Sequence, residues 1–422
     1  MCIMNKNDDD NIEAFSAEEA IQEAEETVNE EAEKIAKSEA NKAADLSAAL
    51  GQAINDAIAK AKNQKIQDSM AAPAQEKPED SKILNSTEIA PTDQDGNPIP
   101  VTIPVALTPN TTVVYTTRLG GVSEGDFAHF NLGGKGGDDP AKVRANREAL
   151  AKELGAKLSL IKQVHSGDAI DVDEVYTDNS PFGFDASGSV DAMLGATYNP
   201  KLSTVDSVDK VNGDVQVLDG DAQVTTKTGI ALGMFAADCL PVLLADDEAG
   251  VIAAAHCGRL GLQKGVIRAT LDMMQEKGAD PARIVATLGP CICGDCYEVG
   301  SDIADDFDAQ FPGTFTLTRF GGPGIDLAAA ALQELTKAGI SEDHIISSRP
   351  RVNAATQYLS EDAELAQLCQ EDNEGDPNLH ERIGKIRHSM CTLENPLWFS
   401  HRRAQLAHKD HEGRMLALIV RR

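Results

Sequence analysis

Three apolar runs of the sequence each end on a side chain that can bind a metal ion. His165 follows LSLIKQV, Cys239 follows ALGMFAAD, and His256 follows GVIAAA. Such runs are typical of buried strands, and strand ends in α/β folds converge on one edge where ligands bind. One thiolate and two imidazoles suit Zn²⁺ and leave its fourth position to water or substrate, as in a catalytic site. Spacing alone leaves an alternative: ordinary polar histidines and a small buried cysteine.

Further strands and helices are needed to position these side chains. Asp139 and Pro140 indicate the start of a helix that ends near Gly155. Two more helices are predicted over Leu262 to Lys277 and Asp326 to Lys337, and further strands at 113–118, 283–290 and 415–420. The predicted fold class is α/β, in an α+β layered form with mixed β-sheets flanked by helices.

The chain divides into regions that differ in their charge. The chain carries 38 Lys+Arg against 68 Asp+Glu, a net charge of −30, which argues against nucleic acid and membrane surfaces as partners. Residues 1–95 are predicted to be an acidic helical or disordered extension with a linker, including a helix from about Ser16 to about Lys65. That helix is either a solvated tail or a docking element for a protein partner. Residues 96–422 form the predicted catalytic domain, with acidic insertions near 175–218 and 358–390 that loop out of it.

The first residues and the cysteines indicate the cellular compartment in which the protein is expected. MCIMNKNDDD has no apolar signal region, and no window approaches the ~20 apolar residues of a membrane span, so a cytoplasmic protein is expected. The 8 cysteines then indicate free thiols or metal ligands rather than disulfides. Cys291, Cys293 and Cys296 lie close in sequence without a nearby fourth ligand, so packing is the prediction for them, with Cys296 bordering the pocket.

About ten separated motifs, in order, resemble the YfiH family, whose members have been called laccase-domain multicopper polyphenol oxidases and purine nucleoside phosphorylases. The resemblance covers about Val113 to the C-terminus apart from the insertions. The motifs include TTRLGGVS (116–123), QVHSG (163–167), DAQVT (221–225), ADCLPVLLAD (237–246), AAAHCGRLGL (253–262), LGPCICGDCYEV (288–299) and WFSHRRAQ with GRMLALIV (398–420).

The resemblance implies a YfiH-like enzyme that binds Zn²⁺ through His165, Cys239 and His256, with Cu²⁺ as the alternative metal. The implied reaction converts adenosine, inosine, guanosine or methylthioadenosine and phosphate into the free base and ribose 1-phosphate, with adenosine deaminase activity alongside. Phosphorolysis needs cationic groups for phosphate, and the candidates are Arg118, Arg259, Arg402 and Arg403. The family commonly reads H-A-G-W-R-G where this chain has HCGRLG, so Arg259 supplies its guanidinium from a displaced position.

Two polar residues of the motifs each have two predicted roles. Asp238, beside Cys239, either orients a histidine as a hydrogen-bond acceptor or acts as general base. Together with Cys239 and Arg259 it makes up the predicted catalytic group. Asn131 of the NLG motif either contacts substrate or shapes the turn.

Three other functions compete with the nucleoside phosphorylase. A cysteine hydrolase would use Cys239 as nucleophile and a histidine as base, as in peptidoglycan-precursor editing, to which some relatives are linked. A laccase would need many histidines, usually in His-X-His pairs, whereas this chain has 9 histidines and no such pair. A non-catalytic protein would use the acidic N-terminal helix to recruit a basic partner.

Overall fold

The computed structural model describes residues 91–189 and 217–422 of the chain. The predicted helix from Ser16 to Lys65, and nearly all of the predicted 1–95 extension, lie outside the described residues. Most of the acidic insertion predicted near 175–218 lies outside them as well. The domain boundary at residue 95 therefore stays a prediction.

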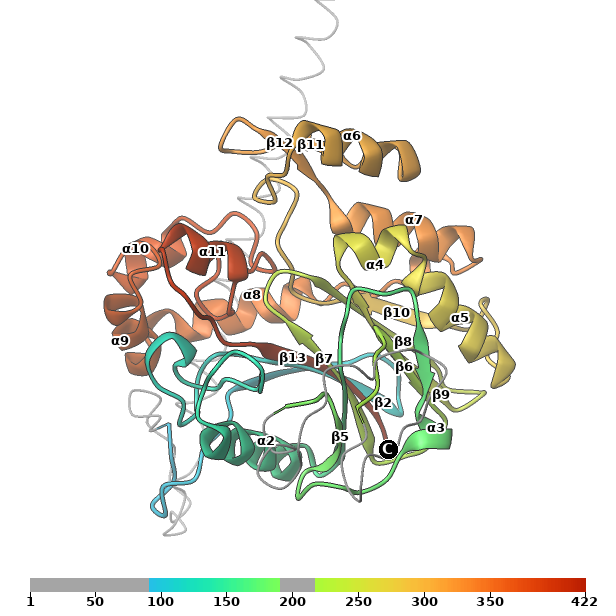
Figure 1. The fold of residues 1–422 in the computed structure, drawn as a ribbon, viewed down its shortest axis with the longest axis horizontal. Coiled ribbons are helices and arrows are strands. Elements are labelled where there is room, and N and C mark those ends of the chain that lie inside the picture. Colours follow the sequence, from blue (N-terminus) through green and yellow to red (C-terminus); the bar gives the residue numbers. More distant parts are fainter. Residues whose placement is uncertain (1–90, 190–216) are drawn as a thin grey trace, which may run out of the picture. The chain divides into compact units, whose positions relative to one another are not determined.

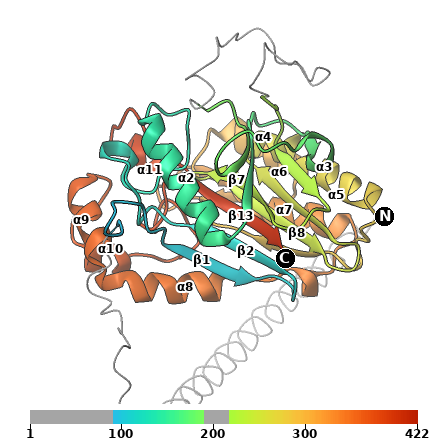
Figure 2. The same cartoon turned by 90° about the horizontal axis from the view of Figure 1, so that it is seen from below.

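Two β-sheets stack face to face, and helices cover their outer faces (Figures 1 and 2). Helix α2 (Pro140–Leu154) packs on the larger sheet, whereas α5 (Val266–Glu276) and α7 (Leu327–Lys337) pack on the smaller one. This arrangement confirms the predicted fold of mixed sheets flanked by helices.

The larger sheet has six strands in the order β1-β2-β13-β7-β3-β5. Strand β3 runs parallel to β5 and β7, whereas β13 runs antiparallel to β2 and β7, so the sheet is mixed. Its strands are β1 (Thr102–Ala106), β2 (Thr111–Thr116), β3 (Lys157–Ile161), β5 (Gly183–Ala186), β7 (Ile230–Ala236) and β13 (Met415–Arg421).

The smaller sheet has five strands in the order β10-β8-β9-β6-β4, and a separate ribbon pairs β11 with β12. Strand β8 runs antiparallel to both β9 and β10. The strands are β4 (Ala169–Asp171), β6 (Ala222–Thr225), β8 (Leu240–Asp246), β9 (Val251–Cys257), β10 (Val285–Leu288), β11 (Phe315–Leu317) and β12 (Pro323–Ile325).

The central strands are buried on both faces, which explains their uninterrupted apolar sequences. Side chains alternate along a strand, so Leu232 of β7 packs between the sheets while Ala231 packs in the layer that contains α2. In the same way, Leu243 of β8 faces the other sheet and Leu244 faces the layer of α5 and α7. The two sheets therefore form one core between them.

Local signals set the helix ends. Asp139 Oδ1 accepts a hydrogen bond from the Ala141 N–H at 2.9 Å, and Pro140 is the first residue of α2, as predicted. The helix predicted from Leu262 to Lys277 is instead two helices, α4 (Arg259–Gln263) and α5. The cause is Gly265, whose φ of 83° lies in the left-handed region and interrupts the helical path.

The acidic segment near 358–390 packs onto the core, although the sequence predicted that it loops out. Leu365 and Leu368 of α9 (Ala363–Glu371) belong to the same hydrophobic cluster as Trp398.

None of the described helices is long and apolar enough to cross a membrane. The remaining helices are α3 (Val172–Val175), α6 (Ser301–Gln310), α8 (Arg349–Tyr358), α9 (Ala363–Glu371), α10 (Leu379–Gly384) and α11 (His401–Leu406).

Candidate active site

The three predicted metal ligands meet, although they come from two different sheets. His165 lies in the loop after β3, Cys239 lies between β7 and β8, and His256 lies within β9. Cys239 Sγ is 3.6 Å from His165 Nε2. One ligand atom from each of the three residues lies within 4.8 Å of the others. The predicted convergence of these side chains is present in the structure.

The backbone around these ligands is unusually constrained. His165 has a φ of 56° and Asp238 a φ of 105°, a region that few residues other than glycine adopt. Gly258 follows β9, and a Cβ at this position would lie 2.8 Å from His165 Cδ2 and 3.0 Å from Cys239 Sγ. The site therefore needs sharp turns and a glycine to bring an imidazole and a thiol so close.

Asp221 organises both histidines, a role that the sequence reasoning missed. Its Oδ1 lies 2.8 Å from His256 Nδ1, which leaves Nε2 of that ring as the ligand atom. Its Oδ2 accepts hydrogen bonds from the Ser166 N–H at 2.5 Å and the Val164 N–H at 3.2 Å, on either side of His165. Asp221 was visible in the DAQVT motif, but its pairing with a histidine 35 residues away depends on the fold.

Electrostatics favour the charged forms of Cys239 and His256. Burial alone would raise the pKa of Cys239, but the charge of His256 and a hydrogen bond from His165 outweigh it and lower that pKa to about 6. Burial would lower the pKa of His256, yet the Cys239 thiolate and Asp221 raise it to about 9. Without a metal ion the site thus pairs a thiolate with an imidazolium, and metal binding would displace the proton from His256 to leave a thiolate and two imidazoles. Such a donor set fits a borderline-soft divalent ion such as Zn²⁺.

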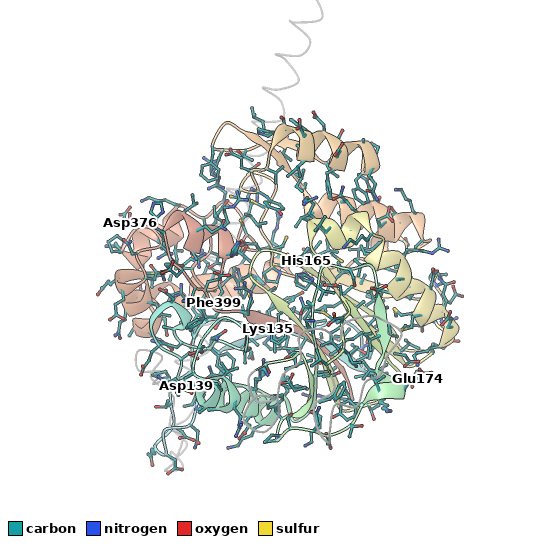
Figure 3. All side chains as sticks on the ribbon, viewed as in Figure 1. Lys135, Asp139, His165, Glu174, Asp376 and Phe399 are labelled. Atoms are coloured by element: carbon teal, nitrogen blue, oxygen red, sulfur yellow. The ribbon has the colours of Figure 1, made fainter. Side chains whose placement is uncertain are left out.

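A pocket of about 1000 Å³ opens beside the ligands. His165 and Lys135, labelled in Figure 3, both line it. Aromatic and polar side chains complete the wall, among them Phe235, Tyr297, His401 and Arg402. A cavity of this size, with apolar rings and a few convergent polar groups, is typical of a site for a small organic molecule.

Asp238 holds one wall of this pocket. Its Oδ1 accepts a hydrogen bond from Thr392 Oγ1 at 2.6 Å, and its Oδ2 accepts one from the Arg402 N–H at 2.7 Å. Asp238 thereby anchors the start of α11, which carries His401 and Arg402 to the pocket. Of its two predicted roles, orienting a histidine ligand falls to Asp221 instead.

Arg118 and Arg403 lie in the core and do not line the pocket, contrary to the expectation that they bind phosphate. They are 1% and 4% exposed. Arg118 pairs with Asp372 at 3.0 Å, and Arg403 pairs with Glu374 at 2.7 Å. Burial would raise the pKa of Glu374, but the neighbouring arginines lower it well below its usual range. The two guanidinium groups therefore neutralise carboxylates of the acidic segment.

Arg259 and Asn131 are likewise engaged with their own surroundings. Arg259 Nη1 donates to Gln263 Oε1 at 2.8 Å within α4. Asn131 Nδ2 donates to the Gly133 carbonyl at 3.0 Å, and its Oδ1 accepts from the Gly133 and Arg414 N–H groups, each at 2.9 Å. Asn131 thus shapes the NLG turn, and of the four predicted arginines Arg402 is the one that lines the pocket.

Comparison with known proteins gives consistent matches. The family model described as "Multi-copper polyphenol oxidoreductase laccase" matches residues 112–361. A Streptomyces griseus protein named "Purine nucleoside phosphorylase ORF3" is 38% identical over 233 residues, covering 54% of this chain and 80% of that protein.

Two more matches bear on activity and fold. "Adenosine deaminase RL5", from an unknown prokaryotic organism, is 30% identical over 230 residues, covering 53% of this chain and 77% of that protein. The crystal structure of Bacillus licheniformis hypothetical protein YfiH has a TM-score of 0.53 and 22% identity, covering 76% of this chain and 99% of that one. At that identity the likeness concerns the fold alone, and the fold agrees with the predicted one.

Proposed function

Because the chain belongs to the multi-copper polyphenol oxidoreductase laccase family, and relatives of it are named purine nucleoside phosphorylase and adenosine deaminase, we propose that it is a zinc-dependent purine nucleoside phosphorylase with adenosine deaminase activity. One observation carries the proposal beyond these names. His165, Cys239 and His256 converge at the edge of a pocket of about 1000 Å³, which they line. Three ligands beside an open cavity are typical of catalytic zinc rather than structural zinc.

A zinc ion held by His165, Cys239 and His256 would supply a positive charge that polarises an oxygen of phosphate or water. The protein itself must then hold the nucleoside. Phe235 and Tyr297 present aromatic rings to the pocket, where a purine can stack. Arg402 lies over the Tyr297 ring at 5.5 Å, and its Nη1 donates to the Glu298 carbonyl at 2.9 Å. That guanidinium is thereby fixed at the wall, where we assign it to the phosphate.

The leaving purine needs a proton, and His401 is placed to donate it. Its ring lines the pocket, and its Nδ1 lies 3.0 Å from Glu412 Oε1. The hydrogen bond with Glu412 raises the pKa of His401, so the ring keeps its proton to higher pH than a free histidine. In this proposal a phosphate oxygen attacks C1′ of the ribose, the bond to the purine breaks, and His401 protonates the departing base.

The ligand set argues against the multi-copper centre named in the family description. Two imidazoles and one thiolate also suit a single Cu²⁺. A laccase, however, needs a further group of copper ions held by many histidines. In residues 91–189 and 217–422, the other candidate metal cluster contains cysteines and a glutamate but no histidine. The site beside the pocket therefore supports one metal ion rather than the group of copper ions of a laccase.

A cysteine hydrolase is the second candidate, because Cys239 has a pKa lowered to about 6 and a histidine nitrogen 3.6 Å away. The two functions differ in their need for metal. A thiol nucleophile requires Cys239 to be free, whereas the zinc enzyme requires it to be a ligand. Removal of metal would activate or spare the hydrolase and would inactivate the phosphorylase.

Product analysis with adenosine tests the proposed function. Purified full-length protein is incubated with adenosine, with and without inorganic phosphate, and adenine, inosine and ribose 1-phosphate are measured. We expect adenine and ribose 1-phosphate only when phosphate is present, and inosine in either case. A His165→Ala variant should form none of these above background, and Cys369→Ser, a buried cysteine in α9, serves as the matched control. Equal product formation by His165→Ala and the unmodified protein would contradict the proposal.

A further inference from the structure

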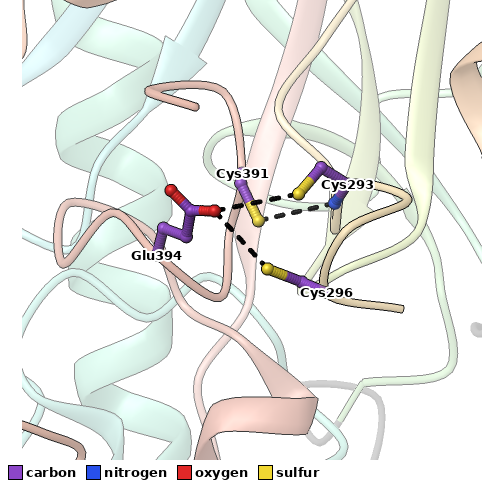
Figure 4. A group of neighbouring side chains, drawn as sticks. All are labelled: Cys293, Cys296, Cys391 and Glu394. Carbon is purple, nitrogen blue, oxygen red and sulfur yellow. Dashed lines mark hydrogen bonds between the residues drawn. The ribbon is translucent and has the colours of Figure 1, made fainter. Parts of the chain in front are cut away.

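A second group of side chains of the types that bind metal ions lies outside the ligand set described above (Figure 4). Cys293 and Cys296 come from the loop after β10, and Cys391 and Glu394 come from the segment before α11. One ligand atom from each of the four residues lies within 4.8 Å of the others. The sequence predicted simple packing because no fourth ligand lies near these cysteines in sequence. The fold supplies two partners from about a hundred residues away.

The four side chains point inward at one another. Glu394 Oε1 lies 3.5 Å from Cys296 Sγ and 3.9 Å from Cys293 Sγ. Cys296 is 0% exposed and Cys391 is 1% exposed, and the Glu394 side chain is 3% exposed. A buried carboxylate facing three sulfur atoms is not the environment that apolar packing of cysteines would select.

Sequence spacing and backbone geometry suit a closed tetrahedral site. Cys293 and Cys296 form a Cys-x2-Cys pair, and Cys391 and Glu394 repeat the same spacing. Short pairs of this kind are typical of structural zinc sites, where two turns each supply two ligands. The Cys293 N–H also donates to Cys391 Sγ at 3.4 Å. Such a hydrogen bond stabilises a thiolate and fixes its direction.

We propose that Cys293, Cys296, Cys391 and Glu394 bind a structural Zn²⁺, separate from the ion assigned to His165, Cys239 and His256. Four protein ligands leave no position for substrate, so this ion does not take part in the reaction.

The groups around Glu394 support this arrangement. Its Oε2 accepts hydrogen bonds from the N–H groups of Arg387 at 2.6 Å and His388 at 2.9 Å, while its Oε1 faces the sulfurs and also accepts from Arg319 Nη2. Three thiolates and a carboxylate around a dication leave excess negative charge. Arg319 forms an ion pair with Glu394 and offsets part of it.

The proposed ion would join two segments that build the active-site wall. Ile292 and Tyr297, on either side of Cys293 and Cys296, line the active-site pocket. The Ile292 N–H donates to the Asp238 carbonyl at 2.9 Å, and Thr392, next to Cys391, donates to the Asp238 carboxylate. A metal at this cluster would therefore hold in place the segments that hold Asp238.

Metal analysis of full-length protein purified under reducing conditions tests the proposal. We expect about two zinc ions per chain, one from each ligand set. Cys293→Ser and Cys296→Ser should each retain about one, and Cys239→Ser should also retain about one. The Cys369→Ser control should retain both. Replacement by Co²⁺ separates the sites further, because sulfur-to-cobalt absorption should be stronger for the three-thiolate site than for the one-thiolate site.

A measurement on the unmodified protein covers the case in which a variant fails to fold. Zinc should protect Cys293, Cys296 and Cys391 from alkylation, and a chelator should expose all three together, as read by mass spectrometry. The proposal is overturned if the reduced protein holds one zinc that Cys296→Ser leaves in place. Alkylation that is unaffected by chelation would also overturn it, as would a disulfide among these cysteines that persists in the reduced protein.

Discussion

The two ligand clusters of this protein differ in the way that catalytic and structural metal sites differ. The first offers three side chains, one of them the exposed His165, beside a pocket of about 1000 Å³. The second offers four side chains, two of them cysteines that are 0% and 1% exposed. The number of ligands and their access to solvent thus separate the two, although both contain cysteine.

The contacts around the two clusters also distinguish an open site from an enclosed one. Asp221 holds His256 of the first cluster in place, and the pocket lies open beside that cluster. The second is enclosed by backbone N–H groups and by Arg319. Residue type alone therefore does not assign a role to a cysteine, whereas the supporting hydrogen bonds do.

The largest expected effect comes from removing a ligand of the first cluster. His256→Ala leaves two ligands and removes the partner of Asp221 Oδ1, so phosphorolysis should fall to the background rate. Zinc at the second cluster should be retained, because that cluster has four ligands of its own. Kinetics and metal analysis on the same sample check this. Substantial turnover by His256→Ala would mean that the first cluster is not the catalytic one.

The next largest effects distinguish the buried Arg118 from Arg402 at the pocket wall. Arg118→Met leaves Asp372 and Glu374 short of a buried partner, and we expect unfolding to become easier by about 3–5 kcal/mol. The KM for phosphate should not change. Arg402→Met should instead raise the KM for phosphate and cause little loss of stability. Denaturant unfolding and phosphate titration measure both, and a raised KM in folded Arg118→Met would restore the phosphate role for Arg118.

A moderate effect is expected at the residue that orients the ligand set. Asp221→Asn keeps the size of the side chain but loses the negative charge that His256 Nδ1 faces. We expect metal affinity at the first cluster, or turnover, to fall by about 10- to 100-fold. Chelator competition with the unmodified protein as reference measures the change. An equal loss at both clusters would indicate a general folding defect.

The smallest effect is in the pH profile. His401 must be protonated to donate to the leaving purine, so phosphorolysis should decline as pH rises through its pKa, which Glu412 raises. His401→Gln should lower the maximal rate and remove that alkaline decline, while the acidic side of the profile should keep its shape. Glu412→Gln should shift the decline to lower pH. An unchanged alkaline side in His401→Gln would assign the proton to another group.

Sequence patterns predicted the elements better than the contacts between them. Apolar runs gave β3, β7 and β9, and Asp139 with Pro140 gave the start of α2, because these signals are local. The two-sheet arrangement and the inward packing of residues 358–390 depend on contacts between distant segments. Asp221 and Cys391 were missed for the same reason. Arg118 could not be told from a phosphate ligand, because its buried partner Asp372 is 254 residues away.

We infer that the His165, Cys239 and His256 cluster carries the chemistry and that the cysteine cluster does not. The decisive experiment measures phosphate-dependent adenine formation and zinc content on the same samples of Cys239→Ser and Cys293→Ser. Each variant should lose one zinc ion, Cys239→Ser should lose turnover, and folded Cys293→Ser should keep turnover within about tenfold. Phosphorolysis that survives in Cys239→Ser and disappears in folded Cys293→Ser would assign the chemistry to the cysteine cluster instead.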